Sequence, residues 1–341
     1  MKDTDQHEKY IKKRVGRNVF NSPPKVSVVI PAYNAAEFIA ETLDSVMAQK
    51  FREHEIIVVN DGSPDTPIFE GALGRHLENI TYIRQRNAGA GAARNTGIEH
   101  AQGDIIAFLD ADDFWLPEFL SSQYIFLQRH VYDMVYCDAQ IFGMRSAYRK
   151  TFMETAPSEG EADFNAILDL RCNVITSGTM VRKQAIIAAG MFETSRVLAE
   201  DFHLWLRIAK TGARIGYQRM PLLKYRVHLD GLSGDSVSRV ERSVDAFRRV
   251  RETIELDTEQ RQILDHRLAG LEADLAVEEG KEFLLGGNFK EAALAFRVAN
   301  RHRKSLRLKI ITLMTSFAPK TLLKYYKRHR AADTGLLPRR D

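Results

Sequence analysis

The sequence contains little cysteine and no long apolar run. Its 341 residues include two cysteines, Cys137 and Cys172, which lie far apart and have no His or Cys at metal-ligand spacing. Neither a disulfide framework nor a zinc site is therefore implied, and a reducing compartment is the default expectation. No window approaches the ~18 apolar residues of a membrane span. Residues 1–17 are charged throughout and lack the apolar segment of a secretion signal. We therefore expect a cytoplasmic protein, at most peripheral on the inner face of the cell membrane.

The formal net charge of +4 is small and unevenly distributed. Residues 301–341 hold 12 Lys or Arg against 2 Asp or Glu, which leaves 37 basic and 43 acidic residues in the rest of the chain. The basic character therefore belongs to the C-terminal tail. The acidic body gives no reason to expect a nucleic-acid partner.

Residues 25–142 alternate between apolar strand-like segments and helix-like segments. Strands this apolar, joined by helices, indicate a largely parallel α/β sheet that is covered on both faces. We expect Asn34 and Glu37 to form a capping box for the first of these helices, and Pro117 to lie in the first turn of a later one. Beyond a boundary near Gly234 the pattern is helical throughout.

Three carboxylates, those of Asp110, Asp112 and Asp113, follow one buried strand within four residues. Two like charges ~4 Å apart repel by about 4 kcal/mol at an effective dielectric near 20. Ligands of parallel sheets bind beyond the carboxyl ends of the strands, and Asp61 also follows such a strand. A hard cation such as Mg²⁺ or Mn²⁺, completed by substrate phosphates, would remove the repulsion. We expect Asp113 to cap the helix that follows instead.

Two other functions are consistent with this acidic cluster. A haloacid-dehalogenase phosphatase would use Asp110 as its nucleophile, although Phe114 stands where Thr or Val is expected. A catalytically silent scaffold would bind a partner through the helical tail. A receiver domain fits poorly, because "PAYN" stands where it requires an acidic pair.

Five motifs follow one another in order: "VSVVIPAYN", "IIVVNDGSPD", "RNAGAGAARNTGI", "GDIIAFLDADD" and "AEDFHLWLR". With them, residues 25–230 resemble an inverting family 2 glycosyltransferase with a GT-A fold. The resemblance implies a charged extension over residues 1–24, a GT-A domain with a mostly parallel sheet flanked by helices over residues 25–235, and a helical C-terminal region with a basic amphipathic tail over residues 236–341.

The same resemblance implies a reaction and its cofactor. A sugar would pass from a nucleotide-sugar, expected to be a UDP-sugar, to a hydroxyl on a glycan or lipid-linked acceptor. A divalent cation, Mn²⁺ or Mg²⁺, would assist this transfer. The product would belong to cell-surface polysaccharide or glycolipid synthesis.

The family pattern also implies roles for particular positions. The nucleotide-sugar ligands would be Pro31, Ala32, Tyr33, Asp61, Arg94, Asp110 and Ala111. The metal ligands would be Asp112, Asp110 and His228, and the catalytic residues Asp201, as general base, and its neighbour Glu200. Each has a structural alternative: a core aromatic for Tyr33, a turn residue for Asp61, a helix-to-sheet tie for Arg94, an N-cap for Asp201 and a structural histidine for His228.

The C-terminal region carries two further patterns. The segment "EEGKEFLLGGNFKEAALAFRVAN" resembles one tetratricopeptide unit, which cannot bury its own face, so we expect a helical hairpin. Residues 304–330 are basic and place Leu306, Ile310, Leu313 and Phe317 on one helical face. This pattern predicts contact with an anionic membrane surface. The alternative is a solvated or protein-packed helix.

Overall fold

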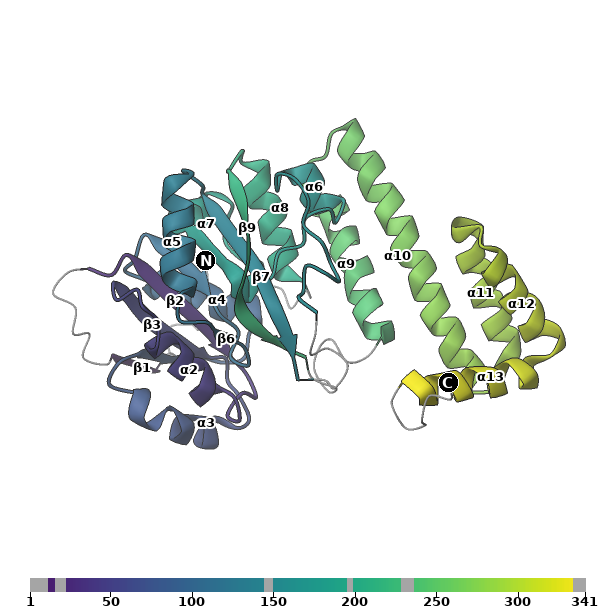
Figure 1. The fold of residues 1–341 in the computed structure, drawn as a ribbon, viewed down its shortest axis with the longest axis horizontal. Helices are drawn as coiled ribbons and strands as arrows, with labels where there is room; N and C mark the ends of the chain where they lie inside the picture. The colour runs from purple at the N-terminus through teal and green to yellow at the C-terminus, as the bar shows by residue number, and fades with distance from the viewer. Residues whose placement is uncertain (1–11, 16–22, 144–149, 195–198, 228–235, 334–341) are drawn as a thin grey trace, which may run out of the picture. The chain divides into compact units, whose positions relative to one another are not determined.

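The computed structural model describes residues 12–15, 23–143, 150–194, 199–227 and 236–333 (Figure 1). The chain divides into two compact units, Met1–Gly231 and Leu232–Asp341. His228, which the family pattern implies as a metal ligand, lies outside the described residues.

The first unit is built on one sheet, which has nine strands within the described residues in the order β1-β4-β3-β2-β5-β8-β7-β9-β6. The strands are β1 Lys12–Val15, β2 Val26–Ala32, β3 His54–Asn60, β4 Thr81–Arg84, β5 Ile105–Phe108, β6 Phe114–Trp115, β7 Met134–Phe142, β8 Thr179–Arg182 and β9 Ile215–Arg226. Strands β4, β3, β2 and β5 are parallel, and so are β7 and β9. Strands β1, β8 and β6 run antiparallel to their neighbours. The predicted GT-A-like sheet is confirmed, and β1 adds a strand from the region expected to be a charged extension.

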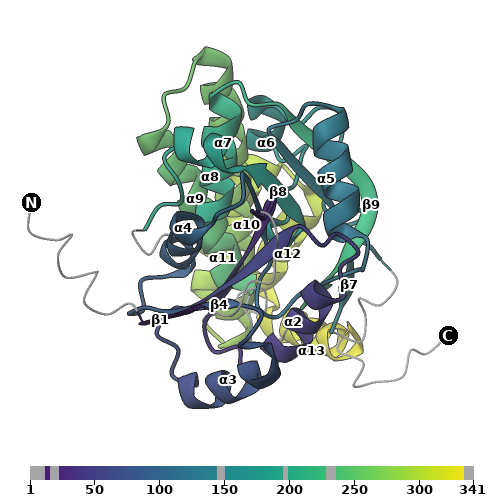
Figure 2. The same ribbon diagram turned by 90° about the vertical axis from the view of Figure 1, so that its left-hand side faces the viewer.

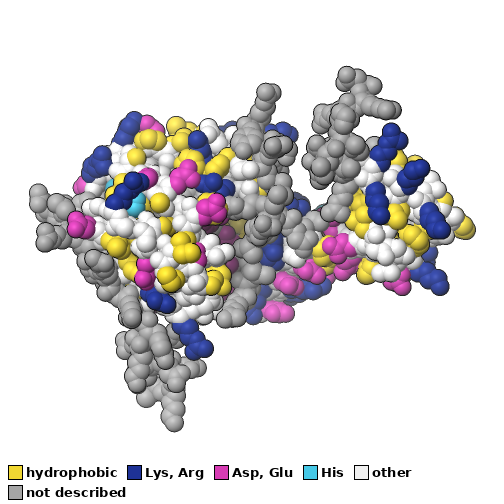
Figure 3. All heavy atoms as spheres, turned by 90° about the horizontal axis from the view of Figure 1, so that it is seen from below, with side chains coloured by type: hydrophobic (Ala, Val, Ile, Leu, Met, Phe, Trp, Pro, Cys, Tyr) yellow, Lys and Arg dark blue, Asp and Glu magenta, His cyan; other side chains and the backbone are white. Residues whose placement is uncertain are grey.

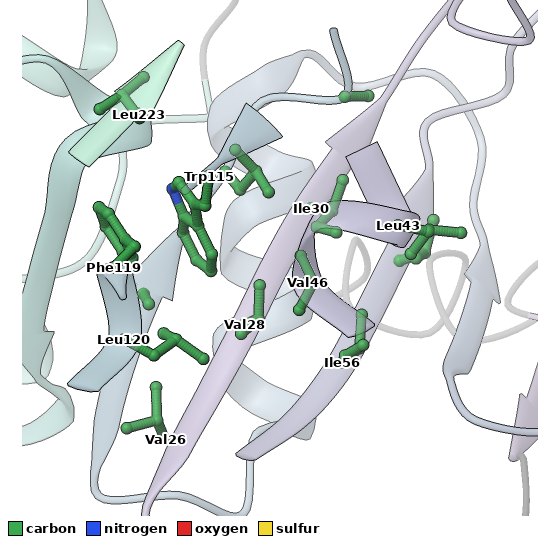
Figure 4. Packing of buried hydrophobic residues seen from close by; sticks show 14 of the residues in the cluster. Val26, Val28, Ile30, Leu43, Val46, Ile56, Trp115, Phe119, Leu120 and Leu223 are labelled. Atoms are coloured by element: carbon green, nitrogen blue, oxygen red, sulfur yellow. The ribbon is translucent and has the colours of Figure 1, made fainter. Parts of the chain in front are cut away.

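Helices cover both faces of this sheet because the central strands are apolar on both sides. Every residue of β2 and β3 is buried. On one face, their side chains pack against α2 Ile39–Met47, α3 Thr66–Leu73 and α5 Phe119–Arg129 (Figure 4). Helix α4 Ala90–His100 lies on the opposite side from α2 and α5 (Figure 2). A Cβ at Gly97 of α4 would lie 2.4 Å from Val29 Cγ1, so this helix needs glycine there to approach β2.

Two helix caps differ from the sequence-based expectation. Helix α2 begins at Ile39, and Asn34 lies outside it in a left-handed conformation with φ 52°. The Asn34 backbone N–H donates instead to Ser63 Oγ at 2.7 Å, so the predicted capping box is wrong. Helix α5 begins at Phe119 without a side-chain cap, so Asp113 does not cap it. In both cases, contacts from distant segments replace the local hydrogen bonds that the sequence pattern favours.

The second unit is helical, as predicted. Its helices are α9 Ser236–Thr253, α10 Thr258–Leu285, α11 Phe289–Arg303, α12 Leu306–Phe317 and α13 Pro319–Asp333. Helices α10 and α11 form the expected hairpin, in which a Cβ at Gly280 would lie 2.7 Å from Phe296 Cε1. Phe296 belongs to an apolar cluster with Leu284, Ala292 and Leu322. Among the described residues, no helix is both long and apolar enough to span a membrane.

Candidate active site

The predicted site residues lie where neighbouring parallel strands end. Asp61 follows β3 and Asp110 closely follows β5, while β2 lies between these two strands and leads into Tyr33. The N-termini of α4 and of α8 Glu200–Lys210 complete the set of elements. The carboxyl edge of the sheet therefore carries the candidate site.

Arg94 connects two of these elements to its own helix, α4. Its Nη2 lies 2.8 Å from Asp110 Oδ1, and its Nη1 lies 2.5 Å from Glu200 Oε1. The Arg94 side chain is only 6% exposed, and its guanidinium lies over the Phe192 ring at 5.4 Å. Arg94 therefore does tie a helix to the sheet, as the structural alternative expected. The tie runs between two acidic groups that the family pattern assigns to the active site.

Burial and the neighbouring charges shift the pKa values of Arg94 and Glu200. Burial works to lower the pKa of Arg94, but Asp110, Glu200 and Asp201 together raise it above its ordinary value. Burial raises the pKa of Glu200, Arg94 opposes that rise, and Asp201 adds to it. Arg94 therefore stays cationic, and Glu200 is harder to ionise than an ordinary glutamate.

Asp201 lies in the first turn of α8, after Ala199 at the N-cap position. It is therefore not the N-cap residue. Its Oδ2 accepts a hydrogen bond from Thr176 Oγ1 at 2.6 Å. The next residue, Ser177, accepts a hydrogen bond from the Asp110 backbone N–H on its Oγ at 3.1 Å. Two adjacent hydroxyls thus contact the predicted base on one side and the acidic strand end on the other.

Sequence reasoning assigned no role to Thr176 or Ser177. Both lie in the 3-10 turn Thr176–Gly178, where they are buried. No signal in the sequence separates these two hydroxyls from the many others. Their partners lie 25 and 67 residues away along the chain.

The segment before α8 is held against α4 by two close contacts. Asn95 Nδ2 donates to the Phe192 carbonyl at 2.8 Å, and the Phe192 N–H donates to Asn95 Oδ1 at 2.9 Å. A Cβ at Gly91 would lie 2.4 Å from the Glu193 carbonyl oxygen. The small residue and the amide of "GAARN" therefore fix the approach that lets Arg94 reach Glu200.

Asp113 is buried, and its Oδ1 accepts a hydrogen bond from the Arg226 backbone N–H at 2.8 Å. Burial raises its pKa well above the usual range, and the neighbouring Asp112 and Asp110 raise it further. Arg226 also donates from Nε to the Asp112 carbonyl at 2.8 Å and lies over Phe142 at 4.4 Å. The third carboxylate thus fixes the acidic turn to the end of β9.

Asp61 is buried and holds the loop that leads into α4. Its Oδ1 accepts hydrogen bonds from Gln85 Nε2 at 2.7 Å and from the Ala88 N–H at 2.9 Å. Its Oδ2 accepts one from the Gly89 N–H at 2.8 Å. The turn-residue alternative is therefore correct in part.

Tyr33 is the most exposed of the residues predicted to bind the nucleotide. Its side chain is 55% exposed, so it is not the core aromatic of the structural alternative. Pro31 and Ala32 are buried at the end of β2, and Ala111 is buried after β5, where its carbonyl accepts from Thr42 Oγ1 at 2.9 Å. The Tyr33 ring is thus available beside a strand end whose backbone is fixed.

Asp110 and Asp112 are the described residues that fit a divalent cation. Both are partly exposed, and a carboxylate pair is the usual protein contribution to a Mg²⁺ site that phosphates complete. Within the described part of the chain, and this acidic turn included, no three His, Cys, Asp or Glu side chains gather as a ready-made metal site. The donor set thus suits a cation that arrives with a phosphate ligand.

Comparison with known proteins identifies the protein family in which these motifs occur. Residues 27–188 match the model of glycosyl transferase family 2. Residues 27–188 therefore form a family 2 glycosyltransferase domain. This match supports a glycosyltransferase rather than a phosphatase or a catalytically silent scaffold.

Two curated relatives cover much of this glycosyltransferase. An uncharacterized glycosyltransferase of Rickettsia prowazekii is 27% identical over 234 residues, which are 68% of this chain and 72% of that one. The Escherichia coli enzyme WfaP, a UDP-Glc:α-D-GlcNAc-diphosphoundecaprenol β-1,3-glucosyltransferase, is 26% identical over 66% of this chain and 86% of its own.

Among solved structures, a mannosyltransferase of Pyrobaculum calidifontis in complex with GDP-Man and Mn²⁺ has a similar fold. The TM-score is 0.60 at 20% identity, with 92% of this chain and 86% of that chain covered. At this identity the likeness concerns the fold, and it agrees with the GT-A-type sheet described above.

Proposed function

We propose that this glycosyltransferase transfers a sugar from a UDP-sugar to a hydroxyl acceptor with inversion and with the help of a divalent cation. The observation that supports it best is the paired contact of Arg94, which holds Asp110 beside the N-terminus of α8, where Asp201 and Glu200 lie. Arg94 thereby holds the carboxylate proposed to bind the donor close to those proposed to activate the acceptor.

Asp201 is the proposed general base. It removes the proton of the acceptor hydroxyl while the hydroxyl oxygen attacks the anomeric carbon. The new carbon–oxygen bond forms on the face opposite the leaving diphosphate, and the bond to UDP breaks in the same displacement. An α-linked donor would give a β-linked product. The Thr176 hydroxyl donates to Asp201 Oδ2 and orients the carboxylate for this task.

The donor would bind along the carboxyl edge of the sheet. The Tyr33 ring lies beside the base, Asp61 accepts from the base N–H, and Asp110 contacts the ribose. Asp110 and Asp112 would hold the divalent cation, which when bound offsets the negative charge on the departing diphosphate. UDP is favoured as the nucleotide because the relative WfaP uses UDP-Glc.

The acceptor is proposed to be a glycan or a lipid-linked glycan. WfaP acts on a diphosphoundecaprenol-linked sugar and matches two thirds of this chain, which supports an acceptor of that chemistry. Such an acceptor places the enzyme at a membrane. The basic helices of residues 304–330 would supply a peripheral contact on the cytoplasmic side.

Ligand-induced stabilisation tests the donor and the cation together. We would measure thermal unfolding with UDP, GDP, CDP and dTDP, each with and without Mn²⁺. A ligand at 100 times its Kd stabilises the folded state by about 2.7 kcal/mol. UDP should raise the melting temperature only with Mn²⁺, and Asp112→Ala should abolish the shift. Asp104→Ala, an exposed carboxylate just before β5, is the matched control and should keep the shift.

Turnover tests the base. UDP-glucose transfer to a diphosphoprenol-linked acceptor should fall by at least about a hundredfold in Asp201→Asn, within the usual contribution of general base catalysis. An Asp201→Asn enzyme that turns over like wild type would refute the assignment of the base. A shift by UDP that ignores Mn²⁺ would refute the assignment of the cation.

A further inference from the structure

Helix α12 has apolar side chains on two faces, and the second unit uses one of them. Leu308, Ile311 and Met314 pack against the cluster that contains Phe296 and Leu322. A helix in a folded unit ordinarily buries one apolar stripe and presents polar side chains on the opposite face.

The opposite face of α12 is apolar as well. Leu306, Ile310, Leu313 and Phe317 are 73%, 49%, 50% and 85% exposed, respectively. Offsets of four, seven and eleven residues at 3.6 residues per turn place these side chains within an arc of about 60° and along about 16 Å of helix. We call these four residues the α12 stripe. A contiguous exposed apolar row of this kind marks an interaction surface.

The charge around the α12 stripe indicates its partner. Residues 304–330 contain eight Lys or Arg and no Asp or Glu. Arg307 and Lys309 are exposed on α12 and lie on the two sides of the stripe. On the second unit, Figure 3 shows Lys and Arg side chains (dark blue) beside apolar side chains (yellow). Apolar side chains flanked by basic ones fit an anionic lipid surface. The apolar side chains insert at the boundary of the acyl chains, and the basic side chains contact the anionic headgroups.

We propose that α12 lies in the interface of an anionic bilayer, with the α12 stripe inserted and with Arg307 and Lys309 at the headgroups. The inference rests on the proposed function only for its purpose, because a lipid-linked acceptor is presented at the same surface. Binding itself follows from α12 alone. It needs neither nucleotide nor sugar transfer.

Vesicle co-sedimentation of the full chain tests this proposal. One set of vesicles is phosphatidylcholine alone, and the other contains about one third phosphatidylglycerol. The wild-type protein should bind the anionic vesicles, and the bound fraction should fall as the salt concentration is raised. Ile310→Gln combined with Leu313→Gln keeps helix-forming residues and should weaken binding by about tenfold or more. The matched control is Ile68→Gln on α3, which changes an isoleucine that is 71% exposed in the other unit and should bind like wild type.

Lys309→Gln separates the charge from the apolar contact. It should reduce the preference for anionic over neutral vesicles by a few-fold and leave the residual binding to neutral vesicles unchanged. Equal binding of wild type to both vesicle sets would overturn the anionic assignment.

Three results would overturn the proposal as a whole. The stripe variant could sediment with vesicles like wild type. It could lower the melting temperature more than Ile68→Gln does, which would mean that the stripe packs against protein. It could convert a wild-type dimer to a monomer in light scattering, which would make a second copy the partner. The UDP and Mn²⁺ melting shift on the same preparations shows independently whether the glycosyltransferase assignment holds.

Discussion

The two units of this chain differ from ordinary globular domains in opposite ways, one in what it buries and the other in what it exposes. The first unit buries ionisable groups: Arg94 is buried and ion-paired with Asp110, and Asp113 is buried and accepts a hydrogen bond from the Arg226 backbone N–H. The second unit exposes apolar surface, most of all at Leu306 and Phe317 of α12. Burying a charged group costs free energy, and leaving apolar surface exposed gives up the stabilisation that its burial would provide. Neither feature is therefore explained by stability alone. Each difference points to the function proposed for its unit, which is chemistry in the first and surface binding in the second.

The strongest test of this contrast compares a buried ion pair with an exposed one. Arg94→Met leaves Asp110 and Glu200 without their cation, and we expect it to destabilise the first unit by about 3 kcal/mol. Arg248→Met removes an exposed pair with Glu272, 2.9 Å apart in the second unit, and should cost less than about 1 kcal/mol. Urea unfolding of both variants measures the difference. Equal costs would show that the Arg94 pairs are not buried in solution.

The second unit offers its own internal comparison, because α10 contains two glycines in different surroundings. Gly280→Ala forces a Cβ to within 2.7 Å of Phe296 and should destabilise the helical hairpin by about 1–2 kcal/mol. Gly270→Ala meets its nearest atom, His302 Nε2, at 3.8 Å and should stabilise the helix by about 0.5–1 kcal/mol. Thermal unfolding followed by circular dichroism measures whether each substitution raises or lowers the stability. A stabilising Gly280→Ala would contradict the close packing of α10 against α11.

The raised pKa of Asp113 predicts a pH dependence with a defined sign. A carboxyl group whose pKa is higher in the folded than in the unfolded state destabilises the fold as pH rises from the unfolded value through the folded one. Asp113→Asn removes this loss and keeps an oxygen for the Arg226 N–H. Its advantage over wild type should be absent near pH 3 and grow as pH rises. It should approach about 1.4 kcal/mol for each unit of pKa elevation.

Urea unfolding at several pH values measures this advantage. Asp65→Asn serves as the control, since Asp65 is a half-buried carboxylate outside the acidic turn. An advantage of Asp113→Asn that stays constant with pH would refute the raised pKa.

Features that depend on local pattern were predictable from the sequence. The apolar strands β2 and β3 are buried on both faces, and that is what a continuous apolar run encodes. The helical second unit likewise follows from its unbroken helical periodicity. Strand β6, which spans Phe114–Trp115, is too short to show any period, and its pairing with β9 depends on residues more than a hundred positions away.

The site was predictable as residue types but not as contacts. Asp110 and Glu200 lie near one another because Arg94 reaches both, and the second of these partners is 106 residues away in the chain. The Asn34 capping box failed for a similar reason: the Ser63 hydroxyl competes for the backbone N–H that the local pattern assigns elsewhere. Local sequence favours one partner for a polar group, and the folded chain supplies another.

The smallest expected effect concerns the hydroxyl that no sequence pattern indicated. Thr176→Val keeps the shape of the side chain but removes the hydrogen bond to Asp201, which is worth about 1 kcal/mol. We expect kcat to fall about five- to tenfold with little change in the KM for the nucleotide-sugar. Thr176→Ser restores the hydroxyl and should recover most of the rate. If Val and Ser lower kcat equally, the methyl group rather than the hydrogen bond matters. If only the KM changes, Thr176 acts on donor binding and does not position the base.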